Sequence, residues 1–372
     1  MASALKPLIF KWRHHHLHFN RFVCRRKRQS LSCRSMAASS SVSASAPSYS
    51  NIIDSHLHIW ASPQEAAGEF PYSAGHEPTL QGDLNFLLKC MEDAGVDGAL
   101  IVQPINHMFD HSLVTSMMED IQGDPYANAY VASVSKIRNL DSPRRLFYNL
   151  QCALRRHPTK FVGCCLANPA DDGAGIRQLE YLVIEEGYKA VRFNPYLWPS
   201  NQKMTNEIGK SLFRKAGDLG VPVGIMCFKG LHLHLSEIEE LCTEFPSTTV
   251  IIDHMGFCKP PINEAERHTF AGLLGLSKFP RVYVKYSALF RISRSSFPYE
   301  DTAPLLSQVI TSYGINRIMW GSDFPFVVAE CGYKEAKESV LHISKLLSLT
   351  STDMEWLMGK TAQTLFKNAW QS

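Results

Sequence analysis

The sequence has no long hydrophobic run and no C-x-x-C motif. No stretch approaches the ~18 consecutive apolar residues that a membrane-spanning helix needs. The ten cysteines form no C-x-x-C pair, and scattered cysteines in a chain of this size indicate reduced, mostly buried thiols. Apolar residues make up 45% and charged residues 20% of the 372 residues, which excludes a disordered or fibrous chain. We therefore expect a soluble globular protein with no membrane partner.

Acidic residues are missing from the first part of the chain. The first acid is Asp54, and residues 1–53 hold nine Lys or Arg and eleven Ser. A basic, Ser-rich segment without acids is typical of an organellar transit peptide, so we expect residues 1–50 to be a transit peptide or disordered leader. The Ser-rich stretch 39–50 favours the chloroplast over the mitochondrion. Met36 is a plausible second start, which would leave that product in the cytoplasm.

The same leader allows two other interpretations. Residues 25–28 read RRKR, as in a nuclear signal or a nucleic-acid patch, and residues 14–18 contain four histidines suited to binding a metal. Without the nine basic residues of the leader, 29 Lys or Arg remain against 35 Asp or Glu. The rest of the chain is therefore acidic, which argues against nucleic acid as a partner.

Short apolar runs alternate with amphipathic patterns from residue 52 to the C-terminus. Eight runs are expected to be strands: Ile52–His58, Ala99–Gln103, Phe161–Leu166, Ala190–Asn194, Val221–Cys227, Val250–His254, Val282–Ser287 and Arg317–Asp323. Near-continuous apolar strands followed by helices indicate a parallel sheet that is covered on its faces. Eight such units predict an α/β fold, a (β/α)₈ TIM barrel over residues 51–372. A doubly wound open sheet is the competing architecture, but no G-x-G-x-x-G follows the first run.

One segment interrupts this alternation. Between the second and third predicted strands, residues 119–154 form a long spacer with a possible strand at 129–134 and a polar helical pattern at 142–155. We interpret it as an insertion in the barrel. An additional element packed on the outside of the barrel is the alternative.

Polar residues end the first and last predicted strands. His56 and His58 are two residues apart, so their side chains lie on one face of a strand and can chelate a cation. Asp323 follows the eighth run, which neighbours the first in a closed barrel. Taken singly, the histidines are also consistent with a hydrogen-bonded core pair, and Asp323 with a helix cap or tight turn. Together they predict a site.

The chain resembles the amidohydrolase superfamily, and within it the amidohydrolase-related branch that contains lactonases, dicarboxylate hydrolases and some decarboxylases. The resemblance covers residue 52 to the C-terminus outside the insertion. It rests on five ordered motifs: IDSHLH (53–58), GYKAVRFN (187–194), DHMG (253–256), VKYS (284–287) and GSDFP (321–325).

This resemblance implies two catalytic residues. His254 corresponds to the histidine that polarises the substrate carbonyl or handles a proton, a task that imidazole can perform near neutral pH. Asp323 corresponds to the general base that activates water and then protonates the leaving group. The alternative for His254 is that it braces the end of the strand together with Asp253.

One position departs from the pattern of the metal-dependent members. They usually supply a further ligand from strand five, where this chain has Met226, and a thioether is a poor ligand for Zn²⁺ or Mn²⁺. Lactonases of the branch work without a tightly held metal. We therefore expect either no obligatory metal or a weak Zn²⁺ or Mn²⁺ site formed by His56, His58 and Asp323.

Three residues are predicted to bind substrate. Arg192 and Arg291 are candidate clamps for a carboxylate, because guanidinium binds carboxylate in a bidentate manner; a structural salt bridge is the alternative for Arg192. Asn194 follows strand four and is expected to line the pocket. Lys285 is interpreted either as structural or as orienting the substrate. Gln103 and His107 are weaker pocket candidates.

The sequence therefore predicts a lactonase-like hydrolase that opens a carboxylated cyclic ester or related carbonyl compound by attack of water. A metal-dependent nonoxidative decarboxylase and a catalytically silent barrel that acts as a binding protein are the alternatives. Nothing in the loops identifies the substrate, and the oligomeric state is undetermined.

Overall fold

The computed structural model describes residues 51–118, 160–200, 202–367 and 369–370. The predicted leader, and the predicted insertion with its possible strand at 129–134, lie outside the described residues. No helix within these ranges is both long enough and apolar enough to cross a membrane.

Eight parallel strands form one sheet in which each strand pairs with the next in sequence. They are β1 (Ile53–Leu57), β2 (Gly98–Val102), β3 (Phe161–Leu166), β4 (Ala190–Phe193), β5 (Val223–Ile225), β6 (Val250–Ile252), β7 (Val282–Ser287) and β8 (Ile318–Gly321). The sheet closes because Leu57 forms a parallel bridge with Phe324, and the His58 N–H donates to the Phe324 carbonyl at 2.8 Å. The predicted (β/α)₈ barrel is confirmed.

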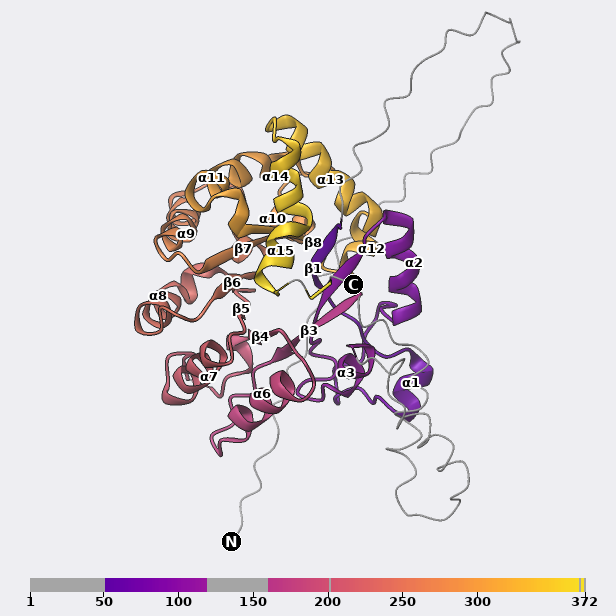
Figure 1. Ribbon diagram of the computed structural model, residues 1–372. Coiled ribbons are helices and arrows are strands. Elements are labelled where there is room, and N and C mark those ends of the chain that lie inside the picture. The colour runs from indigo at the N-terminus through magenta and orange to yellow at the C-terminus, as the bar shows by residue number, and fades with distance from the viewer. Residues whose placement is uncertain (1–50, 119–159, 201, 368, 371–372) are drawn as a thin grey trace, which may run out of the picture. The chain divides into compact units, whose positions relative to one another are not determined.

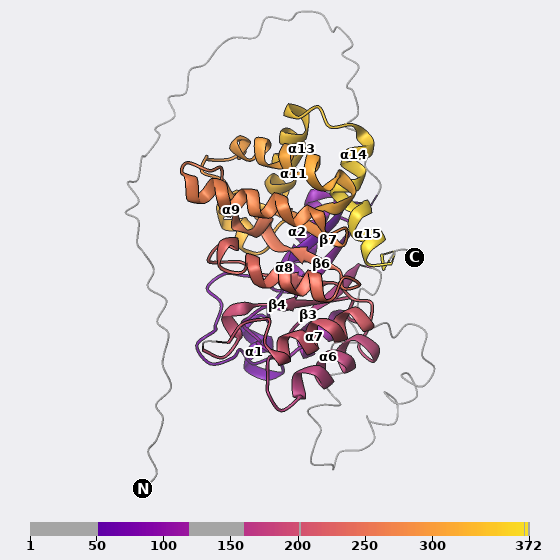
Figure 2. The ribbon, with the colours of Figure 1, turned by 90° about the vertical axis from the view of Figure 1, so that its left-hand side faces the viewer.

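Helices surround this barrel (Figure 1). They are α1 (Pro63–Gly68), α2 (Leu84–Ala94), α3 (Ser112–Met118), α6 (Ala174–Ile184), α7 (Glu207–Asp218), α8 (Leu235–Glu244), α9 (Glu264–Gly275), α10 (Leu289–Ile292), α11 (Ala303–Tyr313), α12 (Phe326–Glu330), α13 (Tyr333–Leu346), α14 (Ser351–Glu355) and α15 (Thr361–Leu365). Figure 2 shows α7, α8 and α9 side by side along one flank of the barrel. Side-chain caps start several of them: Asp83 accepts from the Phe86 N–H in α2, and Asn206 from the Gly209 N–H in α7.

The barrel has an inner and an outer apolar core. The outer core lies between strands and helices, and outward-facing side chains such as Leu57 and Val284 belong to it. The inner core fills one end of the barrel and includes residues from the C-terminus: Ile53, Leu100, Val102, Val162, Cys164, Ala190, Ile251, Ala362, Phe366 and Trp370. Because this end is packed with apolar side chains, polar chemistry is left to the carboxyl ends of the strands, as in TIM barrels generally.

Gly321 lets β8 lie close to β1. A Cβ atom at position 321 would lie 2.8 Å from the His56 Cβ and 2.9 Å from the His56 nitrogen, which is too close for either backbone. We expect Gly321→Ala to displace His56 and to lower both the melting temperature and any activity. Thermal unfolding and the catalytic rate of the same preparation check this. Gly275→Ala, where a Cβ would meet nothing within 4 Å, is the matched control and should leave both unchanged.

Candidate active site

A local irregularity in β1 turns its histidines into the barrel. Ile53 belongs to the inner core and Leu57 to the outer core, although residues four apart share a face in a regular strand. The pairing of β1 with β2 shifts between Asp54 and Leu57, which is the signature of an extra residue. After this shift His56 and His58 both point inward, on the same face as the sequence predicts.

Asp54 joins the two strand ends that carry the site. It is fully buried, and its carboxylate accepts from the His56 N–H (3.1 Å), the Ser322 N–H (2.9 Å) and the Tyr333 hydroxyl (3.0 Å). Burial raises the pKa of Asp54 to about 6, although these hydrogen bonds oppose the rise. Asp54 therefore fixes the backbone beside His56 and beside Asp323.

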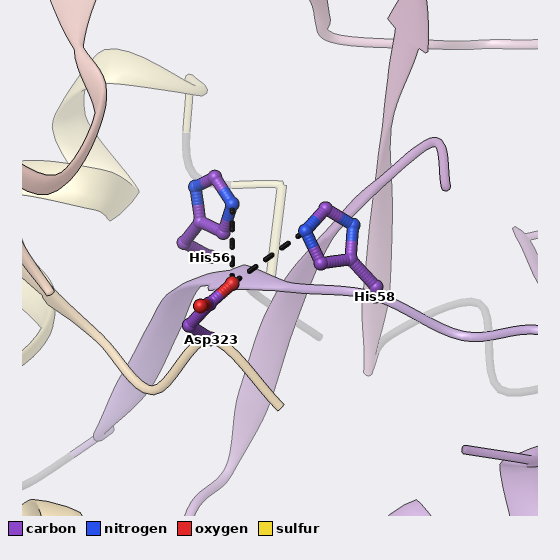
Figure 3. A group of neighbouring side chains, drawn as sticks. All are labelled: His56, His58 and Asp323. Carbon is purple, nitrogen blue, oxygen red and sulfur yellow. Dashed lines mark ion pairs between the residues drawn. The ribbon is translucent and has the colours of Figure 1, made fainter. Parts of the chain in front are cut away.

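Asp323 lies at the centre of the site (Figure 3). Its Oδ1 is 3.6 Å from His58 Nε2, 3.8 Å from His254 Nε2 and 4.0 Å from His56 Nε2. Its Oδ2 accepts from Arg291 Nε at 2.7 Å. The predicted strand over 317–323 ends at Gly321, and Asp323 has a left-handed backbone with φ of 65°. Such a conformation in a residue other than glycine is strained and occurs often at functional sites.

His254 reaches the site through a similar backbone turn. The strand predicted over Val250–His254 ends at Ile252, and a short helical segment over Asp253–Phe257 follows with φ of 49° at His254. Strand alternation would turn His254 outward, since Ile251 and Asp253 face inward; the left-handed turn corrects this. The His254 Nδ1 is 2.8 Å from the Ser287 hydroxyl on β7, so Ser287 orients the ring.

A layer of buried charge lies next to the histidines. Asp253 Oδ2 is 3.0 Å from Arg192 Nε, and its Oδ1 is 3.2 Å from Lys285 Nζ and 3.3 Å from His56 Nδ1. All four side chains are at most 4% exposed. Burial alone would raise the pKa of Asp253, but the charges of Lys285 and Arg192 hold it well below its usual range.

Burial sets the charge states at the centre of the site. It lowers the pKa of His58 to about 3, and it lowers the pKa values of His56 and His254 well below the usual range, with Lys285 adding to the effect on His56. Burial raises the pKa of Asp323 to about 6, although Arg291 lowers it. At neutral pH the three histidines are therefore neutral and Asp323 is an anion that can accept a proton.

Three of these side chains fit a divalent cation. One ligand atom from each of His56, His58 and Asp323 lies within 4.8 Å of the others. The His58 Nδ1 donates to the Val102 carbonyl at 2.8 Å, so its neutral ring presents the Nε2 lone pair to Asp323, an arrangement typical of metal-ligating histidines. Met226 is only partly buried and bonds through its N–H to the Phe193 carbonyl. Two imidazoles and one carboxylate suit Zn²⁺ or Mn²⁺.

The residues predicted to bind substrate lie in three different settings. Arg291, on α10, pairs with Asp323 and remains 28% exposed. Arg192 is buried against Asp253, while its Nη2 has no hydrogen-bond partner within the described residues. The Asn194 side-chain oxygen accepts from the Tyr196 N–H and so caps the turn Pro195–Leu197.

The weaker pocket candidates bond to backbone groups. The Gln103 amide donates to the Met108 and Asp110 carbonyls, and the Ala61 N–H donates to the His107 Nε2. Sequence reasoning gave no role to Ser287 or to Asp54. A signal for Ser287 is present, because it lies two residues beyond Lys285 and so shares its face of β7. No such signal exists for Asp54, because Ser322 and Tyr333, which bond to its carboxylate, lie far away in the sequence.

Comparison with known proteins shows to which family the chain belongs. A family model described as amidohydrolase matches residues 53–367. The 4-sulfomuconolactone hydrolase of Hydrogenophaga intermedia is 30% identical over 109 residues, which is 29% of this chain and 34% of that protein. The chain therefore aligns with about a third of the length of this curated relative.

Solved structures share the fold. A structure assigned as a 2-pyrone-4,6-dicarboxylic acid hydrolase from Pseudomonas putida has a TM-score of 0.60 at 20% identity, covering 86% of this chain and 98% of that one. An amidohydrolase from Burkholderia multivorans with bound zinc has a TM-score of 0.55 at 16% identity, covering 86% and 99%. With the family model matching most of the chain, the protein belongs to the amidohydrolase family.

Proposed function

We propose that this protein is a lactonase-like hydrolase that opens a lactone, or a related carbonyl compound, bearing a negatively charged group. The observation that carries the proposal is the meeting of one anionic carboxylate, Asp323, with neutral histidines from β1 and from the loop after β6. A base and hydrogen-bond donors within 4 Å of each other are what attack of water on a carbonyl requires. The alignment with a sulfomuconolactone hydrolase supports this reaction class.

In the proposed reaction Asp323 accepts a proton from water while the water oxygen bonds to the carbonyl carbon. The Nε2 of His254 donates a hydrogen bond to the carbonyl oxygen and stabilises the developing oxyanion. The ring C–O bond then breaks, and the carboxyl group of Asp323 returns its proton to the leaving alkoxide, which yields a hydroxy acid. A divalent cation held by His56, His58 and Asp323 would supply Lewis-acid polarisation of the same carbonyl.

The charge around the site favours an anionic substrate. Arg291 stacks over the rings of Phe290 and Phe326, each 4.8 Å from its guanidinium carbon, which holds the guanidinium at the partly exposed edge of the site. We propose Arg291 as the clamp for a substrate carboxylate or sulfonate. Arg192 and Asn194 stay predicted substrate contacts; the Arg192 Nη2 has no hydrogen-bond partner in the described part of the chain.

Activity is expected to depend on pH through Asp323. Only the ionised carboxylate accepts a proton, and its pKa is about 6. Below that pH the ionised fraction falls about tenfold per unit, so kcat/KM should fall with a limiting slope of one and be level between pH 7 and 8. A profile measured on enzyme treated with a chelator checks this. A level profile down to pH 5 would contradict the role of Asp323 as the base.

A substrate screen tests the proposed function directly. Sugar lactones, muconolactones and pyrones with and without a carboxylate or sulfonate are offered to the enzyme, with and without a chelator. Ring opening releases a proton that a pH indicator detects. Turnover of charged lactones supports the proposal. Evolution of CO₂ would identify a decarboxylase instead, and no turnover of any compound together with tight binding would identify a silent binding protein.

A further inference from the structure

His56 faces two groups of opposite hydrogen-bonding character. Its Nδ1 lies 3.1 Å from Lys285 Nζ with hydrogen-bond geometry, and 3.3 Å from Asp253 Oδ1 at ion-pair distance. A lysine ammonium only donates, and a carboxylate only accepts. The contact with Lys285 is the shorter of the two and the one with hydrogen-bond alignment. An Nδ1 that accepts from the Lys285 ammonium leaves the ring proton of His56 on Nε2.

The other histidine of the pair has the opposite arrangement. The Nδ1 of His58 donates to the Val102 carbonyl, which can only accept, so the His58 Nε2 carries a lone pair. A metal ion needs a lone pair from each ligating nitrogen. His58 is thus set up as a ligand, whereas His56 presents an N–H toward Asp323 Oδ1, 4.0 Å away.

The fixed charge near His56 disfavours cation binding, as does the hydrogen bond from Lys285. With neutral histidines, the site contains the cations of Arg192, Lys285 and Arg291 against the anions of Asp253 and Asp323. The carboxylate of Asp54, which accepts from the His56 N–H, balances the third cation, so the charge that a cation beside His56 meets most directly is that of Lys285, 3.1 Å from His56 Nδ1. Lys285 is 2% exposed, so water screens its charge weakly.

We propose that Lys285 determines how strongly this site binds a divalent cation. Its ammonium holds His56 as an Nε2–H donor and adds a positive charge, and both effects weaken cation binding while favouring an oxyanion. Lys285 is a positioning residue in this scheme. The inference rests on the proposed function for the identity of the oxyanion, but its effect on cation binding does not require turnover.

Calorimetric titration of zinc chloride into metal-free protein tests the proposal. Lys285→Met is expected to bind Zn²⁺ at least tenfold more tightly than the wild type, and Lys285→Arg, which keeps charge and donor, to bind like the wild type. Lys334→Met removes an exposed lysine side chain on α13 and controls for net charge. Tighter binding by Lys285→Met should disappear in the double variant that also carries His56→Ala. Unchanged or weaker binding by Lys285→Met would overturn the proposal.

A second measurement uses the unmodified protein, in case Lys285→Met does not fold. Long-range ¹⁵N–¹H spectra of the imidazoles report which ring nitrogen carries the proton. We expect the proton on Nε2 in His56 and on Nδ1 in His58. A proton on Nδ1 of His56 would show that Asp253 prevails over Lys285 and would contradict the inference. Absence of lactone hydrolysis with both results as expected would count against the proposed function alone.

Discussion

Asp323→Asn is expected to lower kcat by about 10³-fold or more, with little change in folding. The amide has the shape of the carboxylate but cannot accept a proton, and general acid–base catalysis contributes about 10²–10⁴-fold. The upper part of that range is expected because the same residue acts twice, first on water and then on the leaving oxygen. Steady-state rates on the best substrate, together with thermal unfolding, measure the two quantities.

A buried acid outside the site provides the matched control. Glu237 lies on α8, is 7% exposed and accepts from the Met204 N–H, so Glu237→Gln keeps the acceptor and loses the charge. It should keep the wild-type rate, since the partners of Glu237, Met204 and His234, lie outside the site. Near-full activity of Asp323→Asn would remove Asp323 from the role of base.

His254→Asn is expected to lower kcat by about 10²–10³-fold, which is the usual effect of removing one donor to an oxyanion. Asn is the suitable replacement because it tolerates the left-handed backbone that position 254 adopts, while its shorter side chain cannot extend to the carbonyl. The KM should change little, since the lost interaction strengthens only as charge develops. Rate and KM measured under identical conditions separate the two effects.

A companion variant distinguishes loss of the ring from loss of its orientation. Ser287→Ala removes the hydroxyl 2.8 Å from His254 Nδ1 and leaves the imidazole in place. We expect a smaller loss than for His254→Asn, on the order of tenfold, as for other supporting groups. A loss from Ser287→Ala as large as that from His254→Asn would indicate that the two side chains act as one unit. An unchanged rate in His254→Asn would exclude His254 from catalysis.

The barrel itself could be predicted from the sequence. Each strand of a covered parallel sheet is buried on both faces, so it reads as a short apolar run, and runs such as 161–166 and 282–287 match β3 and β7 residue for residue. The ends of some strands could be predicted less accurately than their positions. The run 221–227 extends beyond β5 at both ends, because apolar residues flank the strand. The run 250–254 extends beyond β6 by Asp253 and His254, where the backbone leaves the strand for a left-handed turn.

The site, too, could be predicted from the sequence only in part. His56, His58 and Asp323 could be grouped from the sequence, since residues two apart share a strand face and the first strand neighbours the last in a closed barrel. Only the tertiary structure decided that His254 turns inward, because a left-handed backbone conformation leaves no pattern in the residues around it.

The sequence by itself determined the fold, the pair of histidines and the terminal aspartate, because burial and strand periodicity are local properties. The tertiary structure decided which groups surround each of them: Lys285 and Asp253 at His56, Arg291 at Asp323, and Asp54 between two strand ends. These contacts join residues up to 279 positions apart. The charge and hydrogen-bonding state of a buried group depends on such neighbours, and only the folded barrel brings them together.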